Sequence, residues 1–163
     1  MPFLISVLYL LFCGIASHLI GEALPRRWFR SDRFPFCPWK WERNGTIYEI
    51  LHIRNWKDHM PDLSRVRKYM VPKRLSRCPT SAQVRALIAE TCVAETVHFA
   101  LCLTAPVIWL FWRSGTGVLL SGIVIVCNLL FICVQRYNRP ALRAFAKRLA
   151  EREEKMRAEQ KNG

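Results

Sequence analysis

The sequence predicts an all-α integral membrane protein with about three transmembrane helices and an aromatic, basic interfacial segment between the first and the second. Composition is the first reason: the 163 residues are 52% hydrophobic yet carry a formal charge of +13, a combination typical of membrane proteins with basic cytoplasmic parts. The second reason is that the basic residues are segregated along the chain. Residues 3–24 contain no lysine or arginine, and between the basic segments 25–96 and 135–163 the one basic residue is Arg113. We expect a single membrane domain, residues 1–163.

The first span is expected within residues 1–24. The stretch FLISVLYLLFCGIASHLIGEAL is long enough to cross a bilayer, for which ~20 apolar residues suffice. It lacks a basic N-terminal region, which argues against a cleaved signal peptide. His18 and Glu22 are four residues apart and share one face of the helix, which in lipid should face protein or water.

An interfacial cytoplasmic segment is expected at residues 25–79. Its aromatic residues are interleaved with arginine and lysine, a mixture suited to the headgroup level of a bilayer. Prolines divide it, so we expect short helices and loops packed under the spans. The residues concerned are Trp28, Phe29, Phe34, Phe36, Trp39, Trp41, Tyr48, Trp56, Tyr69, Pro25, Pro35, Pro38 and Pro61.

A helical hairpin with two spans is expected at residues 80–134. Thr80 and Gln83 have the spacing of a capping box, so the first helix of the hairpin begins outside the bilayer and meets no breaker before Pro106. The spans are predicted at about 97–112 and 116–134, joined by the turn RSGTG.

Residues 135–163 are expected to form a cytoplasmic tail. Pro140 should disfavour helix at Arg139 and leave the Arg136 carbonyl without its helical donor, so the chain is expected to open there. The following residues start as an amphipathic helix and then fray into mixed charge. By the positive-inside rule, this multi-pass protein of the cell membrane has its N-terminus outside and its C-terminus in the cytoplasm.

Several function classes find no support in the sequence. The basic residues flank apolar segments instead of filling one soluble face, and no nucleic-acid-binding signature occurs, so no nucleic acid is expected as partner. The seven cysteines have no C-x-x-C spacing, which predicts neither a metal site nor a disulfide framework. The motifs of soluble hydrolases and the phosphate-binding glycine loop are absent.

Three groups on one predicted helix are candidates for acid–base chemistry: Glu90, Glu95 and His98. With Glu90 at 0°, Glu95 lies at ~140° and His98 at ~80° on the helical wheel. A carboxylate one turn from an imidazole can orient it and stabilise its charged form, as a general base on a hydroxyl requires. Alternatively, His98 has a backbone partner at the interface and the two glutamates pair with arginines.

A second polar group lies at the end of the third span. Asn128 and Gln135 share a helix face, and Arg136 and Arg139 follow. Such groups can bind a phosphate, a carboxylate or the oxyanion of an acyl transfer. A plain stop-transfer anchor is the alternative, and it explains the arginines better than the amides.

Taken in order, several segments resemble the glycosyl-4,4'-diaponeurosporenoate acyltransferase family. They are FPFCPWKWERNGTIYEILHIRNWKDHMPD, ETCVAETVHF and NLLFICVQRYNRPAL, between about Phe34 and Leu142. The specific parts are Trp41-Glu42-x-x-Gly45 with Tyr48, Trp56-Lys57 with Pro61-Asp62, Glu90-Thr91 with Ala94-Glu95 and His98, and Gln135-Arg136-Tyr137-Asn138-Arg139-Pro140.

The resemblance implies a small membrane enzyme of staphyloxanthin-type carotenoid synthesis, which esterifies a sugar hydroxyl of a carotenoid glycoside with a fatty acyl group. It implies lipid substrates, no bound cofactor, and acyl-coenzyme A or an acyl-carrier protein as donor. Val93 and Ala141 stand where the family commonly has arginine. Both departures remove a cation beside the expected site, which puts the acceptor headgroup in doubt more than the reaction type.

We therefore expect a membrane O-acyltransferase with His98 as base and Glu95 or Glu90 orienting it. The alternative is a non-catalytic lipid-binding or scaffold protein, and a homo-oligomer or a partner enzyme is possible in either case. The expected substrate-binding residues are Asn128, Gln135, Arg136, Tyr137, Asn138, Arg139, Trp41, Glu42, Tyr48, Trp56 and Lys57.

Overall fold

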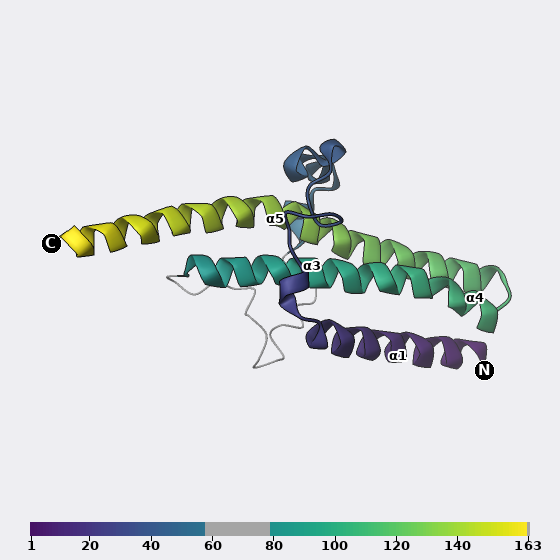
Figure 1. Ribbon diagram of the computed structural model, residues 1–163. Coiled ribbons are helices and arrows are strands. Elements are labelled where there is room, and N and C mark those ends of the chain that lie inside the picture. Colours follow the sequence, from purple (N-terminus) through teal and green to yellow (C-terminus); the bar gives the residue numbers. More distant parts are fainter. Residues whose placement is uncertain (58–78, 163) are drawn as a thin grey trace.

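The protein is a bundle of three long helices crossed by an irregular segment. The computed structural model describes residues 1–57 and 79–162, and this part of the chain contains helices and no strand. The long helices are α1 (Pro2–Ala23), α3 (Ser81–Thr104) and α5 (Gly115–Asn162), shown in Figure 1.

Three stretches are long and apolar enough to cross a membrane: Pro2–Ala23, Ser81–Phe111 and a part of Gly115–Asn162. Apolar side chains such as Phe12, Leu103 and Leu119 are more than half exposed along these helices. In water such surfaces would be unfavourable, whereas lipid covers them. The predicted all-α membrane fold with three spans is confirmed.

The helix α3 begins where its sequence predicts. The Thr80 hydroxyl accepts a hydrogen bond from the Gln83 backbone N–H at 3.2 Å, and the Gln83 side chain accepts one from the Thr80 N–H at 3.0 Å. These reciprocal bonds satisfy two N–H groups that the first turn leaves without helical partners. The helix ends before Pro106, and two short helices follow, η5 (Ala105–Val107) and α4 (Ile108–Phe111).

A tight turn reverses the chain between α4 and α5. A Cβ atom on Gly117 would lie 2.0 Å from the Trp112 carbonyl oxygen, so only glycine allows this approach of backbone to backbone. The helix α5 then runs back along α3, and Ser121 donates a hydrogen bond to the Ala105 carbonyl at 3.1 Å. The two helices thus form an antiparallel hairpin (Figure 1).

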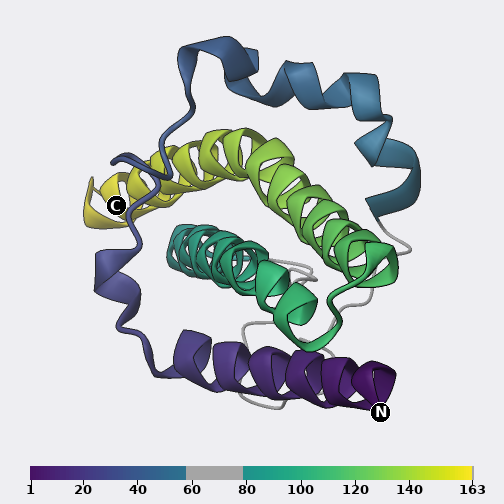
Figure 2. The same ribbon diagram turned by 90° about the vertical axis from the view of Figure 1, so that its right-hand side faces the viewer.

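The expected opening of the chain at Pro140 is wrong, because α5 continues through it. A proline inside a helix costs ~3 kcal/mol or more, and packing on both sides of the helix offsets this cost here. The Pro140 ring lies against Gly45, whose Cβ position is 3.5 Å from Pro140 Cγ. Arg136 and Arg139 are anchored on neighbouring segments. Figure 2 shows that α5 bends along its length without breaking.

The helical hairpin extends beyond its apolar part. Val84 and Ile88 of α3 are buried against Ala146 and neighbouring apolar residues of α5. At the start of α3, the Glu153 carboxylate accepts hydrogen bonds from the N–H and the hydroxyl of Ser81, both at 2.7 Å. The tail is helical as far as Asn162, so the expected fraying is not observed, and these contacts hold its part up to Glu153 on α3.

The helix α1 runs antiparallel to α3 and contacts it at both ends. Near the turn between α4 and α5, the Tyr9 hydroxyl donates to the Thr104 carbonyl at 2.8 Å. Just beyond the other end of α1, Arg26 in η1 (Arg26–Trp28) forms an ion pair with Glu90 at 2.7 Å. Figures 1 and 2 both show α1 beside α3.

The segment between α1 and α3 crosses α5 on its way. It contains η2 (Lys40–Leu51) and α2 (Ile53–Trp56), which lie on the outer side of α5 in Figure 2. Tyr48 and Ile53 are buried there against Val134 of α5. The remainder of this segment, with Pro61, Asp62 and Tyr69, lies outside the described residues.

Candidate active site

Arg136 is the centre of a buried ion-pair cluster. Its Nε and Nη2 donate to the two carboxylate oxygens of Glu42, the second bond being 3.0 Å long. Its Nη1 donates to Glu95 at 2.5 Å and to the Pro35 carbonyl at 3.2 Å, and Nη2 also donates to the Cys37 carbonyl at 3.2 Å. A guanidinium has five N–H donors, so all five of them have acceptors within the protein.

Arg139, one turn further along α5, completes the cluster. It donates to the second oxygen of Glu95 at 2.5 Å, to the hydroxyl and carbonyl of Thr91 at 3.0 and 3.2 Å, and to the Phe36 carbonyl at 2.8 Å. Glu95 therefore binds one arginine with each oxygen. The side chains of the four ionised residues, Glu42, Glu95, Arg136 and Arg139, are at most 10% exposed.

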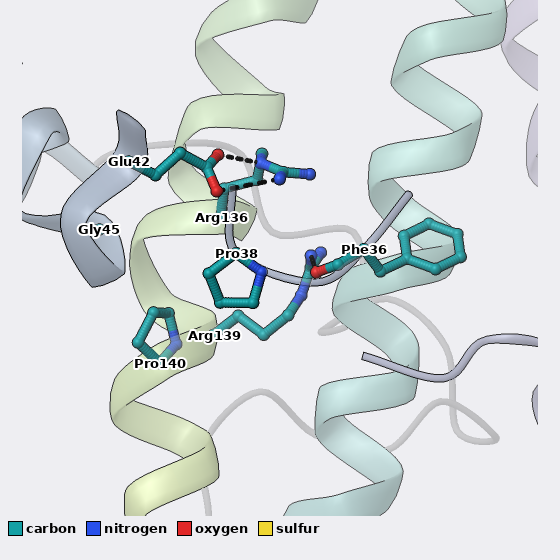
Figure 3. Close-up of a pocket in the computed structure, with 7 residues that line it drawn as sticks. All are labelled: Phe36, Pro38, Glu42, Gly45, Arg136, Arg139 and Pro140. Carbon is teal, nitrogen blue, oxygen red and sulfur yellow. Dashed lines mark hydrogen bonds and ion pairs between the residues drawn. The ribbon is translucent and has the colours of Figure 1, made fainter. Parts of the chain in front are cut away.

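The cluster is electrically balanced, with two carboxylates and two guanidinium groups. Balance and complete hydrogen bonding are the conditions under which buried charges are tolerated. Aromatic rings cover the arginines, since Trp39 lies 4.7 Å from the Arg136 guanidinium and Phe36 lies 5.8 Å from that of Arg139. Figure 3 shows Glu42 facing the guanidinium of Arg136 and Arg139 beside the Phe36 backbone.

Glu42 also organises the segment that carries it. The Tyr48 hydroxyl donates to this carboxylate, as does the Trp39 backbone N–H at 2.7 Å. Burial by itself would raise the pKa of Glu42, but the hydrogen bonds from Arg136 and Tyr48 outweigh it and the pKa is lowered. The ion pair with Arg136 therefore persists at neutral pH and fixes η2 on α5.

A small pocket adjoins the cluster. It is lined by Phe36, Pro38, Glu42, Gly45, Arg136, Arg139 and Pro140 (Figure 3). Its free volume is about 10 Å³, which is room for about one water molecule. The ion pairs of the cluster join the segment 35–48, α3 and α5, and we call this cluster the clamp.

His98 belongs to a separate polar group, one turn further along α3 from Glu95. Its Nδ1 lies 2.8 Å from Oδ1 of Asn128 on α5. Its ring stacks on Phe131, with ring centroids 4.5 Å apart and an interplanar angle of 6°. Both His98 and Asn128 are half-buried, and the stacking contact with Phe131 holds the ring in a fixed plane.

The hydrogen bonds of Asn128 determine which ring nitrogen of His98 carries the proton. The Asn128 amide nitrogen donates to the Val124 carbonyl at 2.8 Å, which turns its oxygen toward the imidazole. Since that oxygen can only accept, Nδ1 of His98 carries the hydrogen. In the neutral ring Nε2 then holds the lone pair, which is the form that a general base requires.

The predicted orienting glutamates have other principal partners. Glu90 pairs with Arg26, and Glu95 pairs with Arg136 and Arg139. The side chain that binds Nδ1 of His98 is the amide of Asn128. The helical wheel of α3 places the three predicted groups on one broad face, but it contains no information about the arginines of other segments that reach them.

The remaining predicted residues differ in burial and in their contacts. Tyr48 and Glu42 are buried in the clamp, and Trp56 donates its indole N–H to the Leu51 carbonyl at 2.8 Å. Lys57 lies nearer the surface, where it donates to Asn138 at 2.9 Å and lies 5.4 Å from the centre of the Tyr137 ring. Trp41 is 54% exposed and Gln135 is 7% exposed.

Several contributors were not predicted as site residues. Thr91, Phe36, Trp39 and Phe131 contact the arginines or the histidine. Phe131 carries a usable signal, because it lies three residues after Asn128 and four before Gln135 and so shares their helix face. Within residues 1–57 and 79–162, no cluster of three His, Cys, Asp or Glu side chains is arranged to hold a metal ion.

Fold and site together define a class: an integral membrane protein whose two longest helices hold a buried ion-pair clamp and, beside it, an oriented histidine. Residues 25–148 match the family of glycosyl-4,4'-diaponeurosporenoate acyltransferases. The chain therefore belongs to that family, and the predictions of this family and of an acyltransferase are confirmed.

Individual relatives support the same assignment. The chain is 28% identical over 139 residues to the glycosyl-4,4'-diaponeurosporenoate acyltransferase of Staphylococcus aureus strain bovine RF122 / ET3-1, covering 83% of this chain and 82% of the relative. Its identity to the protein of the same name from strain MRSA252 is 27% over the same length and coverage. No solved structure matches the chain.

Proposed function

We propose that this protein is a membrane O-acyltransferase that moves a fatty acyl group from a thioester donor to a hydroxyl of a glycolipid or carotenoid glycoside, with His98 as general base. The observation that carries the proposal is the hydrogen bond between Nδ1 of His98 and Oδ1 of Asn128. It holds the neutral imidazole in the tautomer whose Nε2 can accept a proton, and the stacked Phe131 ring fixes its plane.

In the reaction, Nε2 of His98 takes the proton from the acceptor hydroxyl as its oxygen attacks the thioester carbonyl. The carbonyl oxygen becomes an oxyanion, and the intermediate collapses to an ester and a thiolate. The thiolate then receives the proton from His98. Proton transfer by a positioned side chain contributes roughly 10²–10⁴-fold to a rate.

The oxyanion needs a hydrogen-bond donor, and the arginines of the clamp are already engaged with other acceptors. Arg136 was expected in this role, but its five donors are already bound to acceptors. Gln135 remains, because among the described residues its amide has no hydrogen-bond partner and it shares a helix face with Phe131 and Asn128. We therefore assign the oxyanion to the Gln135 amide.

Groups near the surface are suited to the substrates' headgroups. Lys57 is a cation beside Tyr137 and Asn138, which fits the phosphates of an acyl-coenzyme A or acyl-carrier-protein donor. Trp41 presents an exposed ring, which fits a sugar face. The name of the relatives supports a carotenoid glycoside as acceptor. The charge distribution supports catalysis at the cytoplasmic leaflet, with the N-terminus outside and the C-terminus inside.

Mass spectrometry of a reconstituted reaction tests the proposal. Lipids that co-purify with the protein are identified and incubated with the protein and an acyl-coenzyme A. We expect a product heavier by one acyl residue, lost in His98→Ala and retained in His52→Asn, which changes an exposed histidine outside the site. A bound lipid that stays unmodified with all acyl-coenzyme A and acyl-carrier-protein donors would instead identify a lipid-binding protein.

A further inference from the structure

The contacts between α1 and α3 fix their relative depth at three levels. The Tyr9 hydroxyl donates a hydrogen bond to the Thr104 carbonyl at the end of α3. Arg26, just after the end of α1, forms an ion pair with Glu90. Between them, Gly21 faces α3 so closely that a Cβ on it would lie 3.0 Å from Val97 Cγ2 and 3.5 Å from Val93 Cγ1. Gly21 and Val97 therefore face one another across the interface.

Helical geometry then places the residues that follow these two. Each step along a helix turns the side chain by about 100°. Because α1 and α3 run in opposite directions, a forward step on each turns its side chain toward the same side of the helix pair. Glu22 follows Gly21 and His98 follows Val97, so Glu22 and His98 lie on the same side and at similar depth.

That side is the one where α5 lies, because His98 binds Asn128 of α5. Glu22 is no isolated charge on a lipid-facing surface, since its carboxylate is 3.6 Å from Nε2 of His18 and the two side chains are only 30% and 33% exposed. Glu22 is next to the last residue of α1, and an acidic side chain in a membrane helix generally faces protein or water instead of acyl chains, which favours a protein partner or a functional role for it.

We infer that Glu22 is a positioning residue for His98, whose carboxylate stabilises the imidazolium that forms when His98 takes the acceptor's proton. This inference rests on the proposed function. It gives α1 a part in the reaction beyond anchoring the protein. The comparison with known families does not supply this role, because the family match begins at residue 25.

Disulfide cross-linking tests the placement without any assay of activity. In a cysteine-free background, Glu22→Cys is combined with His98→Cys in native membranes and treated with a mild oxidant. We expect a cross-link, because positions 22 and 98 lie on the same side of the helix pair and at similar depth. Small backbone adjustments can then bring the two Cβ atoms to the separation of about 3.5–4.5 Å that a disulfide requires. The matched control is Ile20→Cys with His98→Cys, because residue 20 is turned to the opposite side. Equal cross-linking of both pairs, or of neither, would overturn the placement.

Kinetics test the role. In Glu22→Gln we expect kcat to fall about 10- to 100-fold while KM for the acceptor stays within about twofold, because only the charged form of His98 loses its partner. Glu22→Asp should restore part of kcat. In His98→Ala, Glu22→Gln should cause no additional loss.

Three results would overturn the inference. Unchanged kcat in Glu22→Gln would show that the carboxylate does not act on His98. An equal further loss in the His98→Ala background would show a structural role only. If the cysteine pair cross-links as expected but the wild-type protein makes no product, the proposed function is refuted, and with it the role of Glu22 in catalysis. The placement of Glu22 beside His98 would then stand.

Discussion

Arg136 of α5 and Glu42 of η2 form a buried ion pair in which two guanidinium nitrogens meet two carboxylate oxygens, although 94 residues separate them in sequence. Through this pair the segment after the first span is fixed on the last helix. Glu95 and Arg139 extend the pair to α3. The polar residues at the end of the third span therefore hold three segments together, which a stop-transfer anchor would not need to do.

Loss of one member of this pair should destabilise the protein strongly. For Arg136→Ala we expect a loss of ~3–5 kcal/mol in the free energy of unfolding, because two buried carboxylates lose their shared partner. Arg136→Lys should recover little, since a lysine cannot donate in the bidentate geometry. Unfolding in detergent, followed by circular dichroism over a denaturant series, measures both.

The matched control for the clamp is Arg30→Lys. Arg30 also pairs with a carboxylate, Asp32, at 2.7 Å, but both side chains are about half exposed. Exposed pairs contribute at most ~1 kcal/mol, so this variant should unfold like the wild type. Equal sensitivity at positions 30 and 136 would contradict the clamp.

Acid should weaken the clamp through Glu42. Its pKa in the folded protein is lowered, so its contribution to stability is present above the ordinary glutamate value of ~4.3 and is lost as the pH falls through the lower folded value. Glu42→Gln should be less stable at pH 7 and show a smaller loss between pH 5 and pH 3. Thermal unfolding across this range, with Asp32→Asn as an exposed control, measures the difference.

Alkali should act through Tyr48. Burial, and then the hydrogen bond to Glu42, raise the pKa of this phenol. Its contribution is complete below the unfolded value of ~10 and declines as the pH rises above that value, because the unfolded state ionises first. Tyr48→Phe should therefore flatten the stability curve above pH 10, as followed by thermal unfolding. A curve that is as steep as that of the wild type would exclude Tyr48 as the source.

The backbone conformation at Gly45 should disfavour any side chain. Its φ is +94° and its Cβ position lies 3.4 Å from the Tyr137 carbonyl oxygen. Gly45→Ala should cost about 1–2 kcal/mol, because alanine is strained at this positive φ although the Cβ would make only ordinary contacts. Gly14→Ala is the control, since nothing lies within 4 Å of its Cβ position and alanine favours helix. The two thermal midpoints should shift in opposite directions.

Local features of the fold were predictable from sequence, and contacts distant in sequence were not. The capping box at Thr80 and the three spans depend on neighbouring residues, and they were predicted correctly. Pro140 was not, because the packing that keeps α5 helical there comes from Gly45 and from the arginines' partners. The same limit applies to the site: periodicity places Glu95 near His98 on one helix but does not show which arginines bind it.

Asn128 was predicted as a substrate-binding residue, and the structure supports a different role for it, as the group that orients His98. Asn128→Ala should therefore lower kcat by about 10- to 100-fold while the KM for the donor stays near the wild-type value, because the neutral ring loses its fixed tautomer but keeps its stack on Phe131. Cys127→Ala, at an exposed neighbouring position, should keep full turnover. A rise in KM at constant kcat would instead make Asn128 a substrate contact, as the sequence predicted. Initial rates of acyl transfer at varied donor concentration separate the two roles.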